Sequence, residues 1–204
     1  IDTDGVHSIC YVTGSGNFGA MHGPIASAFF AHLGGASTTV GSLCCAGTSA
    51  AEVPIYGQRF LDTRNQIEKS NYVIAWGNNP AISKQGYFQR FEKMMENGGK
   101  FVVIDPICTE SAAKASEWIQ PWPGTDAALG MAMLNVIISE DLYDHDFVEK
   151  WCYGFDEWRE RCSEWTPEKA AEVAWCDADD IRKAARFIAT NGACAAPFGV
   201  SNDQ

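Results

Sequence analysis

The sequence predicts an α/β fold in which a mostly parallel, doubly wound (Rossmann-like) sheet is followed by a helical C-terminal region. Three observations support this fold class. Short apolar runs alternate with helical patterns in the order of βαβ units. The runs Tyr72–Trp76 and Lys100–Asp105 are almost continuously apolar, as expected for parallel strands covered on both faces. Hydrophobic residues make up 46% of the 204 residues, which is enough to bury a core.

Hydrophobic periodicity predicts the elements of the first half in turn. Apolar alternation or continuity indicates strands, and apolar positions three and four residues apart indicate helices. The helix that precedes the Lys100 strand is expected to end at Asn97-Gly98-Gly99, because glycine adopts the left-handed conformation that terminates helices. In chain order we expect a strand at Ser8–Thr13, a helix at Met21–Leu33, a strand at Thr38–Val40, a helix at Ala50–Leu61, a strand at Tyr72–Trp76, a helix at Gln85–Glu96 and a strand at Lys100–Asp105.

Polar residues mark the starts of the later helices. Thr125 and Asp126 introduce a helix that extends to Ser139, where their side-chain oxygens can accept from free backbone amides. Thr166 and Asp177 are the predicted N-caps of the last two helices. The remaining expected elements are helices at Asp144–Lys150, Pro167–Ala174 and Ala178–Thr190, and a strand at Ala193–Val200.

Charge is distributed unevenly along the chain. No Asp, Glu, Lys or Arg occurs from Gly5 to Ala51, whereas acidic residues recur every few positions from Glu140 to Asp180. A solvated surface needs frequent charges, so the uncharged segment is expected to be buried against more protein or a large ligand. We therefore expect the function to depend mainly on the N-terminal half.

The formal net charge is −11, from 15 basic and 26 acidic residues. Such a field repels nucleic-acid phosphates and anionic lipids, so neither nucleic acid nor a membrane is an expected partner. No apolar stretch approaches the roughly 18 to 20 residues of a membrane span, and the N-terminus lacks the features of a signal peptide. The chain starts without Met, so an upstream piece is expected.

The segment GSGNFG, residues 14–19, fits the GxGxxG pattern between a predicted strand and a predicted helix. Its glycines would let the backbone approach a pyrophosphate, and the helix N-terminus would supply amides and partial positive charge. A nicotinamide site also needs an acidic residue about 20 positions further on, but none occurs before Glu52. A different phosphate-bearing cofactor is therefore favoured, with a nicotinamide cofactor and a tight turn without a ligand as alternatives.

Polar loops follow the buried strands. The segment WGNNPAIS, residues 76–83, ends one strand, Asp105-Pro106 ends the next, and residues 123–126 precede the following helix. Open α/β sheets bind ligands at the carboxyl ends of their strands. Each loop by itself is equally compatible with a capped turn. The three together favour a shared nucleotide site, in which an Asn amide can both donate to and accept from a ring edge.

Cys44 and Cys45 occupy an expected strand-to-helix turn within the uncharged segment. Adjacent Cys residues do not easily chelate one small tetrahedral ion together, and the ligand spacing of a zinc site is absent. From spacing alone, the expected role is that of a small core hydrophobe, with metal ligand or nucleophile as the alternatives.

Five segments in order resemble one enzyme family: GSGNFGAMHG, CCAGTSA, YVIAWGNNPAIS, FVVIDPICTESA and WPGTDAALGMAMLNVIISEDLYDHDFV. They resemble the catalytic subunit of the dimethyl sulfoxide reductase family, the molybdenum or tungsten molybdopterin oxidoreductases that carry two molybdopterin guanine dinucleotides. Family members are several times longer, so the resemblance implies a fragment of a larger multidomain enzyme. Residues 1–60 would be part of a molybdopterin-binding domain with the metal-ligand loop, and residues 61–204 would be a guanine-dinucleotide-binding domain.

The resemblance also implies roles for single residues. Cys45 would be the catalytic residue and the protein thiolate on the metal, because the family's ligand precedes a small-residue helix start, matched here by residues 46–49. Gly16 and Asn17 would lie near a pterin. Asp126 would pair with the N–H donors of guanine. The full set implied for the guanine dinucleotide is Trp76, Gly77, Asn79, Pro80, Ser83, Asp105, Thr109, Gly124, Thr125 and Asp126.

The resemblance narrows the reaction class without identifying the small-molecule substrate. Formate dehydrogenases of the family have His directly after the metal-binding residue, where this chain has Ala46, so formate oxidation is disfavoured. Cys ligation fits oxo transfer or a related reduction, and it also fits the non-redox hydration of the acetylene hydratase branch, which the CCAGTSA and WCYGFDEW segments resemble most. From other classes, a non-catalytic nucleotide-binding module and a Rossmann dehydrogenase are the alternatives.

Further components follow from the same resemblance. A 4Fe-4S cluster is expected in an upstream part of the enzyme. The expected partners are the remaining segments of the same enzyme and an electron-transfer subunit. The compartment would be the cytoplasm or the periplasmic face in a prokaryote.

Overall fold

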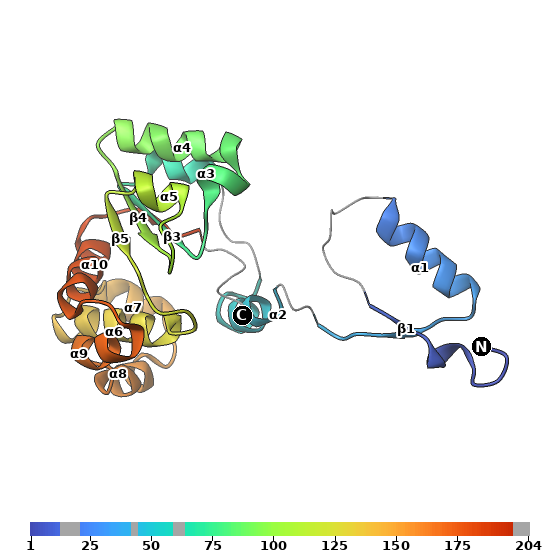
Figure 1. The fold of residues 1–204 in the computed structure, drawn as a ribbon. Helices are drawn as coiled ribbons and strands as arrows, with labels where there is room; N and C mark the ends of the chain where they lie inside the picture. The colour runs from blue at the N-terminus through green and yellow to red at the C-terminus, as the bar shows by residue number, and fades with distance from the viewer. Residues whose placement is uncertain (13–20, 42–44, 59–63, 198–204) are drawn as a thin grey trace. The chain divides into compact units, whose positions relative to one another are not determined.

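The computed structural model describes residues 1–12, 21–41, 45–58 and 64–197, and it confirms the α/β fold class with parallel strands (Figure 1). The chain divides into two compact units, Ile1–Phe60 and Leu61–Asn202. None of the helices within these described ranges is long and apolar enough to cross a membrane.

The N-terminal unit contains a small parallel strand pair. Strand β1 (Cys10–Tyr11) pairs with β2 (Ser37–Thr38), and helix α1 (His22–His32) connects them. The paired segments are shorter than the predicted strands Ser8–Thr13 and Thr38–Val40, because Ser8 belongs to the 3-10 turn η1 (Val6–Ser8) and β2 ends at Thr38. Thr13 lies outside the described residues.

Helix α2 (Ala46–Tyr56) corrects the predicted helix Ala50–Leu61. Its first turn consists of small residues that resemble a turn in sequence, yet Ser49 N–H donates to the Cys45 carbonyl and closes a helical turn there. The helix ends where Gly57 adopts φ +79° and donates to the Val53 carbonyl. The left-handed conformation is readily available to glycine, so the stop lies before the predicted one.

Within the described residues of the second unit, four parallel strands form a sheet in the order β5-β4-β3-β6. The central pair is in register along its whole length, from Tyr72 opposite Lys100 to Trp76 opposite Ile104. The strands are β3 (Tyr72–Trp76), β4 (Lys100–Ile104), β5 (Glu117–Ile119) and β6 (Cys194–Ala195).

Side chains of the central strands alternate between two cores, because successive residues of a strand point to opposite faces. One buried cluster contains Tyr72, Ile74, Val102 and Ile104, and the other contains Val73, Ala75, Phe101 and Val103. Both faces are apolar, which explains the continuous apolar runs of the sequence. Burial of one Val, Ile or Phe side chain contributes about 1.5 to 3 kcal/mol.

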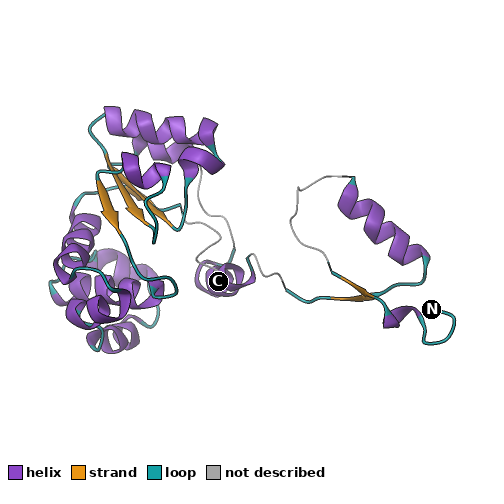
Figure 2. Cartoon of the chain, in the orientation of Figure 1, coloured by secondary structure: helices purple, strands orange, loops and turns teal. Residues whose placement is uncertain are grey.

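Helices cover both faces of this sheet (Figure 2). Helix α4 buries Phe88, Phe91 and Met94 in the Val73 cluster, and α6, α9 and α10 pack in the Tyr72 cluster. The helices of this unit are α3 (Pro80–Ser83), α4 (Gln85–Glu96), α5 (Glu110–Lys114), α6 (Asp126–Ser139), α7 (His145–Trp151), α8 (Phe155–Ser163), α9 (Pro167–Ala174) and α10 (Ala178–Thr190), preceded by the 3-10 helix η2 (Arg64–Lys69).

The sequence prediction missed several short elements. It did not include α3, α5, α8 or β5, each of which is too short or too polar to give a clear periodic signal. The predicted strand Ala193–Val200 is paired only at Cys194–Ala195, and residues 198–200 lie outside the described residues. The predicted N-caps Thr166 and Asp177 are confirmed, since their side chains accept from the Lys169 and Asp179 amides.

We expect the isolated 204-residue chain to associate in solution. Helix α1 carries no charged Asp, Glu, Lys or Arg, and its Ile25 and Phe29 are 61% and 59% exposed. Uncovered apolar surface of this kind favours association. Light scattering during gel filtration should detect species larger than a monomer.

The double variant Ile25→Ser/Phe29→Ser should reduce this association. As a control, Trp151→Ser removes an aromatic side chain of the second unit that is 77% exposed, and it should have a much smaller effect. A monodisperse monomer that melts cooperatively would contradict the expectation that the uncharged segment needs further burial.

Candidate functional site

The loops after β3 and β4 meet at one edge of the sheet, because parallel strands in register end at the same level. From β3 the chain continues to β4 and β5 on one side, whereas β6 pairs with the other side of β3. This reversal is a topological switch point, the place where open α/β sheets bind ligands. We call residues 76–79, 105–111 and 124–126 the carboxyl edge.

Trp76 and Asp126 are joined across this edge. The Trp76 indole Nε1 donates to Asp126 Oδ1 at 2.6 Å, although the two residues are 50 positions apart in sequence. The second carboxylate oxygen of Asp126 has no hydrogen-bond partner among the described residues. Asp126 is the first residue of α6, where the helix dipole favours a negative charge.

Asn79 ties the β3 loop to helix α5. Its Oδ1 accepts from the Ser111 backbone amide at 3.2 Å and from Ser111 Oγ at 2.7 Å, and its Nδ2 donates to Glu110 Oε2 at 2.9 Å. Ser111 is fully buried, and its Oγ also accepts from the Ala81 amide. The side-chain oxygen of Asn79 therefore accepts two hydrogen bonds from within the protein.

The hydrogen bond from Asn79 is the main cause of a lowered pKa of the exposed Glu110 carboxyl, with a smaller contribution from its own backbone amide. A lowered folded-state pKa means that the contact stabilises the fold at pH values above the ordinary pKa of 4.5. Its contribution is lost as the pH falls through the lowered pKa. The β3 loop is thus tied to α5 at neutral pH.

Asp105 and Thr109 shape the loop after β4. Asp105 is 8% exposed, and its Oδ1 accepts from the Ile107 amide at 3.1 Å. Thr109 is the N-cap of α5, with its Oγ1 accepting from the Ala112 amide at 3.1 Å. Both residues belong to the carboxyl edge, and both use side-chain atoms to hold it.

Thr125 and Ser83 also make internal hydrogen bonds. Thr125 does not cap α6 with its side chain, which corrects the prediction, because its Oγ1 donates backward to the Trp122 carbonyl at 2.6 Å. Ser83 Oγ donates to the Asn79 carbonyl at 2.8 Å. Pro80 is fully buried at the start of α3.

Gly77, Asn78 and Gly124 also belong to the carboxyl edge. Gly77 and Gly124 have φ values of +55° and +81°, in the left-handed region that glycine adopts at no steric cost. A Cβ at Gly124 would meet nothing within 4 Å, so the space beside this turn is open. Asn78 is 8% exposed, and its side chain makes no hydrogen bond with any described residue.

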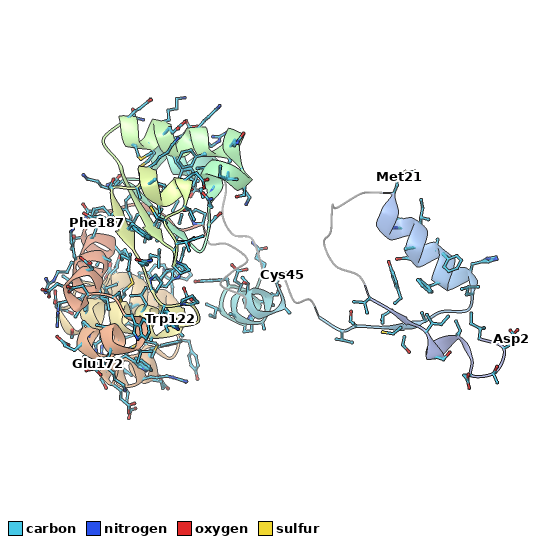
Figure 3. The ribbon with its side chains drawn as sticks, viewed as in Figure 1. Asp2, Met21, Cys45, Trp122, Glu172 and Phe187 are labelled. Atoms are coloured by element: carbon cyan, nitrogen blue, oxygen red, sulfur yellow. The ribbon has the colours of Figure 1, made fainter. Side chains whose placement is uncertain are left out.

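Cys45 belongs to the other unit, where it is the N-cap residue of α2 (Figure 3). It is partly buried, and its carbonyl accepts from the Ser49 amide and hydroxyl. A thiolate at this end of a helix is favoured by the helix dipole. Cys44, Gly16 and Asn17 lie outside the described residues.

Sequence reasoning missed Glu110 and Ser111, although a signal was available. They directly follow the N-cap Thr109, and the first turn of a helix exposes backbone amides that a neighbouring loop can use. In the described part of the chain, no three His, Cys, Asp or Glu side chains group in the manner of a metal site.

Comparisons with known proteins identify the family of the chain. A family model described as molybdopterin oxidoreductase matches residues 1–199. The chain is 42% identical over 138 residues to acetylene hydratase of Syntrophotalea acetylenica, a match that covers 66% of this chain and 19% of that protein. It is 34% identical over 193 residues to the thiosulfate reductase molybdopterin-containing subunit of Salmonella typhimurium, covering 86% of this chain and 24% of the relative.

Among solved structures, acetylene hydratase from Pelobacter acetylenicus matches with a TM-score of 0.77 and 33% sequence identity. The match covers 95% of this chain and 26% of that one, so the chain spans about a quarter of the length of this structural relative. The resemblance inferred from the five sequence segments is confirmed. The chain belongs to the molybdopterin oxidoreductase family.

Proposed function

We propose that this chain is the cofactor-binding part of the catalytic subunit of a molybdenum or tungsten enzyme with two molybdopterin guanine dinucleotides. The carboxyl edge is the observation that carries the proposal. At this edge, one carboxylate oxygen of Asp126 is left to accept hydrogen bonds, and glycine turns lie at the switch point of the sheet. The chain that carries this edge belongs to the molybdopterin oxidoreductase family.

The residues of the edge fit a guanine nucleotide. A carboxylate has about four acceptor positions, and the Trp76 indole uses one of those on Asp126. The rest can accept the two neighbouring N–H groups that guanine presents and adenine lacks. The open space at Gly124, two residues before Asp126, supports access to this carboxylate.

Cys45 is the proposed protein ligand of the metal. Its position at the first turn of α2 supports this choice, because the helix dipole favours the thiolate that a metal requires. When bound, the metal would supply oxygen-atom and electron transfer or Lewis-acid activation of the substrate. The chain's own residues would hold the cofactor, with Asp126 accepting from guanine and Asn79, Asp105 and Thr109 keeping the loops in shape.

Oxo transfer or a related reduction is the proposed reaction class, with a 4Fe-4S cluster upstream and an electron-transfer subunit as partner. The second candidate is a non-redox hydration. It is favoured by the 42% identity with acetylene hydratase. Both candidate reactions would act on a small-molecule substrate.

Elemental and nucleotide analysis tests the proposal directly. The full-length protein, purified under native conditions, should contain near-stoichiometric Mo or W together with guanine nucleotide. Bound nucleotide without Mo or W would support a non-catalytic nucleotide-binding module instead. With metal present, electron exchange with an artificial donor would favour the redox class, and turnover of an alkyne without electron exchange would favour hydration.

Substitution of Cys45 should remove the metal and most of the activity. In the full-length enzyme we expect Cys45→Ala to lose most activity and Cys44→Ala to keep much of it. Metal content by mass spectrometry gives a readout that is independent of turnover. Equal losses in the two variants, or the reverse order, would reject Cys45 as the ligand.

Asp126→Asn should weaken retention of the nucleotide by on the order of 1 to 3 kcal/mol. The Trp76 N–H would hold the amide oxygen of the new Asn, so its NH₂ group would face the N–H donors of guanine. The measurement is guanine nucleotide content after gel filtration of the full-length enzyme. Asp141→Asn, two residues beyond the end of α6, is the control for removal of one charge. Equal nucleotide content in both variants would count against base recognition by Asp126.

A further inference from the structure

Helices α7 and α8, together with the turns that flank α7, line a hollow on the surface of the second unit (Figure 1). We call it the α7–α8 hollow. It contains none of the residues of the carboxyl edge. Aromatic rings and carboxylates line it together. The rings belong to Tyr143, His145, Tyr153 and Phe155, and two of the carboxylates belong to Glu149 and Glu157.

One guanidinium of the chain itself lies in this hollow. The Arg159 guanidinium lies over the Phe155 ring, 5.1 Å from its centroid, and its Nη1 donates to Asp156 Oδ1 at 2.9 Å. The Tyr143 ring packs against the rings of His145 and Phe155. A planar guanidinium can stack on a ring while it pairs with a carboxylate. The hollow therefore has the chemistry that recognises an arginine side chain.

The α7–α8 hollow has capacity for a further cation. Glu149 and Glu157 are exposed, and neither forms a hydrogen bond or a salt bridge with a described residue. Tyr153 is 102% exposed, and Trp151 beside the same turn is 77% exposed. Tyr and Trp are enriched at protein interfaces. Two uncovered aromatic side chains present more apolar area than a small cation covers, so a protein partner fits better than a small molecule.

The charge around the hollow indicates the kind of protein. The segment from Glu140 to Asp180 contains 14 Asp and Glu residues against four Lys and Arg, so it carries −10 of the net charge of −11. Surfaces that are permanently covered are depleted of charge, as expected for the uncharged segment Gly5–Ala51. A second copy of the chain would bring the same negative charge and be repelled. The partner that fits is a separate protein with a basic surface.

We propose that the α7–α8 hollow is a docking site for a separate basic protein, an arginine of which binds the Tyr153 ring and the carboxylates of Glu149 and Glu157. Arg159 already makes the same two kinds of contact within the chain, with Phe155 and with a carboxylate. The inference does not depend on the proposed function, because no residue of the carboxyl edge takes part.

The test measures binding of a fluorescein-labelled hexaarginine peptide to the full-length enzyme by fluorescence anisotropy at physiological salt. The double variant Glu149→Gln/Glu157→Gln should bind the peptide about fivefold or more weakly, because it removes two carboxylates of the hollow. The matched control Glu164→Gln/Glu172→Gln removes the same charge from exposed positions outside the hollow. It should keep most of the affinity, because salt screens distant charges.

The aromatic contribution is tested separately. Tyr153→Ser should weaken hexaarginine binding about two- to fivefold at unchanged net charge, because the ring is lost. Tyr153→Phe keeps the ring and should bind the peptide as the wild type does. A hexalysine peptide should bind more weakly than hexaarginine, since an ammonium group does not stack on a ring. The melting temperatures of all variants should equal that of the wild type.

Three outcomes would overturn the inference. Equal losses in the two double variants would mean that the acidic segment attracts cations in general, without a docking site at the hollow. Equal binding of hexaarginine by Tyr153→Ser and the wild type would remove the aromatic part of the recognition. A full-length enzyme that does not bind hexaarginine would show that the hollow is covered within the enzyme itself.

Discussion

The parallel pairing of β3 with β4 is the constraint on which the rest of the second unit depends. Five residue pairs in register place Trp76 beside Ile104, so both strands end at the same level. Because the side chains alternate between two apolar clusters, a shift by one residue would move every buried side chain to the other face. The register therefore fixes both the core and the level at which the polar loops begin.

Most polar side chains of the carboxyl edge and its neighbouring turns hold the loops in shape, and few are left to bind a ligand. Asp105, Thr109, Ser83 and Thr125 use side-chain atoms for hydrogen bonds within one or two turns of their own position. Such bonds hold the loops in one conformation before a ligand binds, which reduces the entropy lost on binding. Among the described residues, the second oxygen of Asp126 is left with capacity for a ligand.

The proposed metal ligand and the proposed nucleotide site belong to different units of the chain. Cys45 is positioned by α2, and the carboxyl edge is positioned by the sheet of the second unit. Under the proposed function the chain holds the cofactor, while the choice between redox chemistry and hydration depends on groups that surround the substrate.

Local sequence determined the elements whose signals are complete within a few residues. The bounds of β3, α4, α9 and α10 match the prediction, because β3 is a continuous apolar run, the helices have strong apolar periodicity, and α9 and α10 have capping side chains at their starts. The polar loops at the strand ends were equally visible. Apolar periodicity did not show the first turn of α2, since its small residues also suit a turn. The family resemblance implied a helix start there, and the bond from the Ser49 amide to the Cys45 carbonyl closes that turn.

Tertiary structure alone decided which polar groups meet and which stay unpaired. The bond between Trp76 and Asp126 spans 50 positions, and the bond between Asn79 and Ser111 spans 32. Such contacts depend on strand register and on the crossover of β6 to the far side of β3, and neither leaves a local pattern. Asn78 and Asn79 are the same residue type at adjacent positions, yet among the described residues only Asn79 joins the β3 loop to α5, because the fold places its side chain beside Glu110 and Ser111.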